Sequence, residues 1–220
     1  PCGNSMEGDP DMPTALDVAK YLIHLATPRD GEDTDALGPM RLQKLLYYLQ
    51  GWHLAAHGRR IFSDDIEAWK HGPVVREVYA HFKNCGLAIP HTEGAIPESL
   101  SDDSKAFIES IWDRMKGFSA TALRDMTHRE SPWLEARGNL PPEANCNDVI
   151  GAESMRSFFV PKYAELLKHK DSRIDVAMWV SSVNAIQAGR SRTAGDLRRE
   201  FRNRHFGPDR RPHPIVDASN

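Results

Sequence analysis

The histidines, cysteines and acidic residues are the places in this sequence where chemistry could occur. His53 and His57 lie four residues apart, the spacing at which two imidazoles on one helix face can share a zinc ion. A zinc protease would require the pattern His-Glu-x-x-His, and the residue after His53 is Leu54. The nearby sequence offers no third ligand. We therefore expect His53 to pack in a core and His57 to lie at a helix end, and we predict no metal site.

Two other groups of residues could carry acid–base or nucleophilic chemistry. Asp125, His128 and Glu130 lie close together in the sequence, but such a group usually forms a solvated or capping arrangement. Cys85 and Cys146 would need an activating base beside them, and the local sequence supplies none. The sequence also contains neither a glycine-rich phosphate loop nor a GxSxG elbow. We predict that the protein is not an enzyme and has no cofactor.

The composition is that of a folded protein of the cytoplasm. Of the 220 residues, 40% are apolar and 27% are charged, as in ordinary globular proteins. The three cysteines are widely spaced, which argues against a disulfide framework and favours a reducing compartment. No apolar run approaches the roughly 20 residues needed to span a bilayer. The formal net charge of −3 does not point to nucleic acid. We expect a cytoplasmic protein without a membrane partner.

The spacing of apolar residues predicts a mainly α-helical fold. The strongest signals are a helix over 14–25, which begins with a Thr14/Asp17 capping box, and a central helix over 39–57 that ends at Gly58. Further helices are expected over 74–83, 101–116, 119–128, 131–137, 152–159, 162–169, 172–188 and 193–205. Ser101 and Ser119 should cap the second and third of these.

A small two-stranded β element is also expected. Ile61-Phe62 and the stretch from Ile66 to Trp69 flank Asp64-Asp65, which should form the turn. His71-Gly72-Pro73 should be a turn into the next helix, and Pro161 should separate two helices. The predicted architecture is a compact multi-helix domain with this β element and a C-terminal helical extension.

Two tryptophans differ from the rest because they lie beside turn prolines. Trp69 precedes His71-Gly72-Pro73, and Trp133 follows Ser131-Pro132. An aromatic side chain in such a place can seal the edge of a core, which is the ordinary fate of tryptophan, or can anchor a partner protein. Both interpretations remain open at this point.

Three blocks of the sequence resemble the signature of the Panacea domain of SocA-like antitoxins. They are Leu42–Tyr48 with its continuation Gln50–Ala55, Ile66–Val75 followed by Val78, Tyr79 and Phe82, and His128–Trp133. Their order and spacing agree over about residues 14–160. We accordingly expect a flexible start with an expression remnant over 1–12, a Panacea domain over 13–160 and a helical extension over 161–220.

The resemblance implies an antitoxin that neutralises a cognate protein toxin by direct contact, often encoded in a prophage. It also implies that the toxin can be delivered to a ClpXP-type protease, with this protein as the adaptor. We expect the partner to be bound by aromatic and charged side chains near the two turn motifs: Trp69, His71, Tyr79 and Trp133.

The segment after about residue 160 departs from the family pattern and is strongly basic. Residues 190–211 hold eight arginines and three acidic residues, a local charge of +5. Arg198, Arg199 and Arg202 could pair with carboxylates of a toxin or protease, bind nucleic-acid phosphates, or form a solvated surface. The alternative function is therefore a DNA-binding transcriptional autoregulator that uses this segment.

Overall fold

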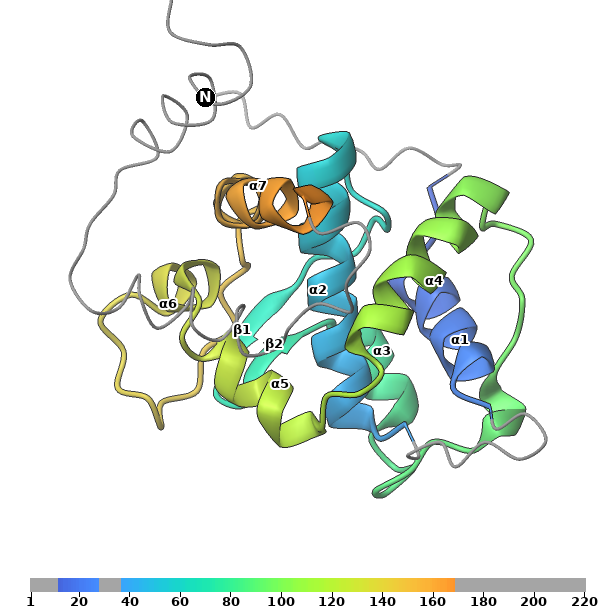
Figure 1. Ribbon diagram of the computed structural model, residues 1–220. Helices are drawn as coiled ribbons and strands as arrows, with labels where there is room; N and C mark the ends of the chain where they lie inside the picture. Colours follow the sequence, from blue (N-terminus) through green and yellow to red (C-terminus); the bar gives the residue numbers. More distant parts are fainter. Residues whose placement is uncertain (1–11, 28–36, 169–220) are drawn as a thin grey trace, which may run out of the picture. The chain divides into compact units, whose positions relative to one another are not determined.

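Helix α2 (Pro39–His57) is the element on which most of the other elements pack (Figure 1). Every residue from Arg41 to Leu54 is buried, so the helix is enclosed on all sides. It ends, as predicted, at Gly58, whose φ of 70° places it in the left-handed conformation typical of a helix C-terminus. Because several of these enclosed residues are polar, their side chains must find hydrogen-bond partners inside the domain.

Six further α-helices surround α2 in residues 12–27 and 37–168, the part of the chain that the computed structural model describes. Their apolar side chains form a continuous core with those of α2. The prediction of a mainly α-helical fold with a small β element is confirmed. The helices are α1 (Ala15–Leu25), α3 (Arg76–Phe82), α4 (Asp102–Met115), α5 (Ala120–Thr127), α6 (Ser131–Arg137) and α7 (Ala152–Lys168), with a 3-10 turn, η1 (His91–Glu93), between α3 and α4.

Three helix starts that the capping residues predicted are confirmed. Thr14 accepts a hydrogen bond from the backbone N–H of Asp17, and the Asp17 carboxylate accepts one from the backbone N–H of Thr14. At the starts of α4 and α5, the hydroxyl oxygens of Ser101 and Ser119 accept from the backbone N–H groups of Ser104 and Ala122. Each cap satisfies an N–H that has no partner within its own helix.

The two-stranded sheet is present, but it lies later in the chain than predicted. Strands β1 (Glu67–Trp69) and β2 (Gly72–Val74) pair antiparallel, with Ala68 opposite Pro73. The expectation that His71-Gly72-Pro73 only turns into a helix is therefore wrong. Pro73 fits a strand here because both backbone groups of Ala68 point away from β2. The N–H of Ala68 donates to the Asp148 carbonyl and its carbonyl accepts from Arg137, so the position opposite Ala68 needs no donor.

The expected strand at Ile61-Phe62 is wrong because α2 already satisfies its backbone. Gln50 Oε1 accepts from the N–H of Ile61 at 2.9 Å, and Gln50 Nε2 donates to the carbonyl of Phe62 at 3.2 Å. Asp64, which was expected in the turn, accepts from the N–H of Ala15 at 2.7 Å, at the start of α1. The buried side chain of Gln50 thus takes the place of a strand partner for Ile61 and Phe62.

Helix α7 continues through Pro161, where the sequence predicted a break between two helices. The proline removes the N–H that would bond to the carbonyl of Ser157. Packing on both sides of this position compensates. Before it, Phe159 meets three aromatic rings of α2 at centroid distances of 5.1 to 6.0 Å. After it, Tyr163 meets the ring of Trp52 at 6.3 Å. The helix therefore also crosses residue 160, where a domain boundary was expected.

Within residues 12–27 and 37–168, no helix combines the length and the apolar character that crossing a bilayer requires. The helices expected over 172–188 and 193–205 lie outside the described residues.

Candidate partner-binding site

The turn of the β1–β2 hairpin consists of Lys70 and His71, and His71 is exposed. The turn closes at Gly72, whose φ of 99° lies in the left-handed region that favours glycine. A Cβ at Gly72 would also come within 2.6 Å of Cε in the Lys44 side chain. Both the backbone conformation and the close approach of α2 therefore call for glycine here.

Four side chains form a bonded cluster on the outer side of the hairpin. Arg76 pairs with both carboxylate oxygens of Glu67 at 2.9 and 2.8 Å, and Trp69 Nε1 donates to Glu67 at 2.6 Å. The rings of Trp69 and Tyr79 meet edge to face at 4.9 Å, and the Arg76 guanidinium lies 5.8 Å from the Trp69 ring centroid. Tyr79 is 39% exposed. We call this cluster together with His71 the hairpin face.

Two side chains of α2 hold the hairpin from its inner side. Gln43 Oε1 accepts from the N–H of Val75 at 2.7 Å and its Nε2 donates to the Val75 carbonyl at 3.4 Å, so Gln43 replaces a strand partner. Lys44 Nζ donates to the Pro73 carbonyl at 2.9 Å. Burial, and then the charge of Arg124, lower the pKa of Lys44 to about 7. Placing this amine beneath the hairpin therefore costs free energy, because burial disfavours its charged form.

Helix α6 holds strand β1. Trp133 Nε1 donates to the carbonyl of Trp69 at 3.0 Å, and Arg137 Nη1 donates to the carbonyl of Ala68 at 3.1 Å. Trp133 is only 4% exposed. The structure thus places this predicted contact residue in the core, directly behind Trp69. Arg137 Nη2 also fixes the loop that follows α6, through the carbonyls of Pro141, Pro142 and Ala144.

The residues considered for acid–base chemistry do not converge on one site. Asp125 pairs with Arg124 at 2.7 Å near the surface. The ring of His128 stacks on Trp133 with centroids 4.3 Å apart and planes at 8°. Burial first, and then the charges of Lys44 and Arg124, lower the pKa of His128 to about 4, so it is neutral at neutral pH.

Glu130 is buried on the core side of α6. The Tyr48 hydroxyl donates to Glu130 Oε1 at 3.1 Å. Burial raises the pKa of this carboxyl, while Tyr47, Lys162 and Tyr48 lower it. Lys162 of α7 is itself buried, and burial lowers its pKa. The buried acid therefore connects α2, α6 and α7, and we assign it a structural role.

His53 and His57 are neighbours, with ring centroids 4.5 Å apart. Both pack on Phe107. His53 Nδ1 donates to the carbonyl of Arg59 at 2.8 Å, and burial lowers the pKa of His53 to about 4. In the described part of the chain, no three His, Cys, Asp or Glu side chains gather where they could hold a metal ion.

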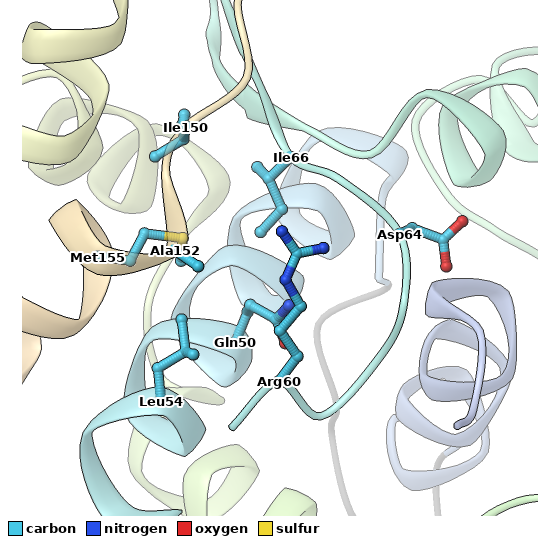
Figure 2. A pocket seen from close by; sticks show the side chains of 8 residues that line it. All are labelled: Gln50, Leu54, Arg60, Asp64, Ile66, Ile150, Ala152 and Met155. Carbon is cyan, nitrogen blue, oxygen red and sulfur yellow. The ribbon is translucent and has the colours of Figure 1, made fainter. Parts of the chain in front are cut away.

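Figure 2 shows a small pocket between α2 and the start of α7. Its cavity volume is about 10 Å³, room for about one water molecule, whereas small-molecule sites usually hold about 300–1,000 Å³. We assign no ligand to it. Its walls are formed by Gln50, Leu54, Arg60, Asp64, Ile66, Ile150, Ala152 and Met155.

Comparison with known proteins identifies the family to which this chain belongs. Residues 42–134 match the family described as "Antitoxin SocA-like, Panacea domain". The chain is also 30% identical over 137 residues to Antitoxin SocA of Caulobacter vibrioides (strain NA1000 / CB15N), an alignment that covers 57% of this chain and 71% of that protein. The chain belongs to the SocA-like Panacea family. No solved structure matches the sequence. Membership of this antitoxin family supports the role of antitoxin in a toxin–antitoxin pair.

The three Panacea blocks meet at the hairpin. The first supplies Gln43 and Lys44, the second is the hairpin itself, and the third supplies Trp133. Of the residues predicted to contact a partner, Trp69 and Tyr79 lie together and His71 is at the adjacent turn. The predicted Arg198, Arg199 and Arg202 lie outside the described residues.

Sequence reasoning missed two members of the hairpin face. Glu67 and Arg76 are nine residues apart and belong to different elements, so no local pattern pairs them. A usable signal did exist: Glu67 and Trp69 are two residues apart in a strand, which puts both side chains on one face. A correct assignment of the hairpin would therefore have pointed to Glu67.

Proposed function

We propose that this protein neutralises a protein toxin by direct contact, and that the hairpin face is the contact surface. The observation that carries the proposal is the bonded cluster of Trp69, Glu67 and Arg76 on a hairpin that side chains of α2 and α6 hold from behind. No turnover is required, because binding alone can cover or distort the part of the toxin that causes harm.

The physical argument concerns the entropy of binding. Association costs free energy when side chains become ordered at an interface, about 0.5–1.5 kcal/mol for each flexible one. Here Glu67 fixes Trp69 and Arg76 before any partner arrives. Tryptophan, tyrosine and arginine are also the residues that most often dominate binding energy. A prearranged set of the three is therefore suited to anchoring a partner.

The test uses the toxin whose lethality this protein suppresses on co-expression, in the first place the product of the adjacent open reading frame. Trp69→Ala should weaken binding of the purified toxin by about 30-fold or more, the usual effect of removing an interface anchor. The variant should remain folded, with a thermal midpoint only several degrees below that of the wild type. Leu87→Ala is the control, because Leu87 is 96% exposed and lies outside the hairpin face. An unfolded Trp69→Ala variant would show that Trp69 is a core residue.

Masking and delivery to a ClpXP-type protease are two modes of the same proposal. Masking inhibits the toxin in a purified mixture that contains no protease. In delivery, the purified toxin keeps its activity when this protein is added, and protection disappears in cells that lack the protease. The hairpin face is needed in both cases, so Trp69→Ala should abolish protection in either.

We propose the arginines of the C-terminal segment, Arg198, Arg199 and Arg202, as a second contact with acidic residues of the toxin or protease. A chain shortened after Gly189 should then bind its protein partner less tightly. If a mobility shift on the operon's own promoter disappears with the same deletion, the segment serves DNA binding and autoregulation instead.

A further inference from the structure

Residues 148–150 form a third extended segment beside β1. The N–H of Ala68 donates to the Asp148 carbonyl at 2.9 Å, and the N–H of Ile150 donates to the Ile66 carbonyl at 2.8 Å. These two bonds enclose an antiparallel bridge between Glu67 and Val149. Figure 2 shows Ile150 and Ile66 side by side at the inner pocket, where both are buried.

Val149 occupies the opposite side of this segment. Because side chains alternate along an extended chain, Val149 lies on the outer face, and it is 48% exposed. Val149, Glu67 and Val74 form one row across the segment, β1 and β2. Trp69 lies on the same side of β1 as Glu67, two residues further along. The outer surface of residue 149 is therefore continuous with the hairpin face.

The backbone of Val149 forms an open edge. In an antiparallel ladder, the residue between two bonded neighbours directs its own N–H and C=O away from the partner strand. Within the described residues neither group of Val149 has a hydrogen-bond partner. A buried backbone group is nearly always paired, and the flanking Asn147, Asp148 and Gly151 are all exposed, so both groups face solvent.

The other edge of the sheet is closed. Lys44 donates to the carbonyl of Pro73, and Gln43 bonds both backbone groups of Val75. Folded proteins usually cover or charge their strand edges, because an open edge pairs with other chains. At Val149 the edge carries an exposed β-branched apolar side chain instead, which favours strand pairing.

We infer that the edge at Val149 accepts an extended segment of the toxin as an added β-strand. This inference rests on the proposed function and names the form of the partner: a strand with a free N–H and C=O opposite Val149 and an apolar side chain on the outer face. Its backbone bonds supply affinity that does not depend on the identity of its side chains, while the hairpin face supplies the specific contacts. A helix could not pair with these groups, since its own backbone bonds are already formed.

The decisive variant is Val149→Pro. It removes the N–H that faces the partner but leaves intact the two bonds to β1, which use Asp148 and Ile150. Affinity for the purified toxin should fall about tenfold or more, because a carbonyl of the partner loses its donor. Val149→Thr is the matched control. It keeps the N–H and the β-branched shape, and its affinity should stay within about threefold of the wild type.

Amide hydrogen exchange shows whether a loss of affinity in Val149→Pro comes from the missing N–H or from local unfolding of the segment. In the wild-type complex the Val149 amide should become protected, while the Ala68 and Ile150 amides should be protected with or without toxin. If Val149→Pro exposes the Ala68 amide, the protection of Val149 in the wild-type complex decides the question. Protection supports the added strand, and its absence overturns it.

Three further results would contradict the inference, and they are distinguishable. Toxin binding that Val149→Pro leaves unchanged rules out the added strand but leaves the proposed function standing. A wild-type protein that does not bind the toxin removes both. A wild-type homodimer that Val149→Pro converts to a monomer, with toxin affinity unaltered, would identify a second copy of this chain as the occupant of the edge.

Discussion

On the inner side of the hairpin, Gln43, Lys44 and Trp133 bond to backbone groups of the strands and of Val75, whereas on the outer side Glu67 and Arg76 bond mainly to each other and to Trp69. The inner bonds would form with any strand that followed the same backbone path. The outer ones depend on which side chains the hairpin carries.

The inner side chains therefore hold the scaffold together, whereas the outer side chains can determine which partner binds. The first and third Panacea blocks supply the inner side chains, whereas the second block is the hairpin itself and includes the outer residues Glu67, Trp69 and Tyr79. The outer side chains can change without disturbing the bonds behind them. The same scaffold can in this way present different surfaces, which fits the proposed function of contact with a particular toxin.

The strongest test of this comparison measures the stability of two variants, Trp133→Ala on the inner side and Trp69→Ala on the outer side. Trp133→Ala should lower the free energy of unfolding by about 3–5 kcal/mol, because it leaves a cavity in the core and an unpaired carbonyl on Trp69. Trp69→Ala should cost less than half as much, since part of that ring is already in solvent. Urea denaturation of the two variants measures both values. Equal losses would mean that the hairpin has no separate outer side.

A second test removes a side chain that replaces a strand partner. Gln43→Ala leaves the N–H and the carbonyl of Val75 without their partner in the core, which should destabilise the protein by about 2–4 kcal/mol. The control is Glu77→Ala, at an exposed position in α3, which should stay within about 0.5 kcal/mol of the wild type. If Gln43→Ala is as stable as the control, the bonds to Val75 do not hold the hairpin.

The same distinction explains what the sequence could and could not predict. Signals that act within a few residues were read correctly: the caps at Thr14, Ser101 and Ser119, and the glycine that ends α2. Each of these depends on a hydrogen bond or a backbone angle of the segment itself. The three family blocks were also identified, because order and spacing are properties of the sequence alone.

Errors arose wherever a distant side chain decides local structure. Gln50 satisfies Ile61-Phe62, so that pair is not a strand, and the packing of Phe159 carries α7 through Pro161. The candidate site was found only in part for the same reason. The turn motif pointed to Trp69, but the pairing of Glu67 with Arg76 is set by the hairpin register and cannot be read from spacing.

A third test, of intermediate size, uses pH to probe the inner side. Burial and the nearby Lys44 and Arg124 lower the folded-state pKa of His128 to about 4, below its ordinary value near 6.5. Between these values the unfolded chain binds a proton that the folded protein does not, so stability should rise as the pH increases from about 4 to 6.5.

His128→Phe keeps a ring against Trp133 but removes this titration, so its stability should rise less over the same range. The difference should be roughly 1–2 kcal/mol, allowing for the partial exposure of His128. Thermal unfolding across this range measures it, and His91→Gln, at an exposed position in η1, controls for the loss of an imidazole. If the plots of stability against pH for His128→Phe and the wild type are parallel, His128 titrates as it does in water and does not belong to the inner side of the hairpin.

The smallest expected effect on stability is on the outer side, at Arg76. Its pair with Glu67 is largely exposed at the arginine end, so Arg76→Ala should leave the free energy of unfolding close to that of the wild type. Toxin affinity should nevertheless fall about three- to tenfold, because the guanidinium no longer fixes the carboxylate that orients Trp69.

Arg76→Lys sharpens this last prediction. A lysine keeps the charge but cannot form the two parallel bonds to Glu67, so it should restore stability fully and affinity only in part. Lys116→Ala serves as the control, because it removes another exposed pair, with Asp113 at 2.9 Å, at the end of α4 and outside the hairpin face. If Arg76→Lys binds toxin as tightly as the wild type, charge alone matters at this position, and the fixed geometry of the outer cluster contributes nothing to recognition.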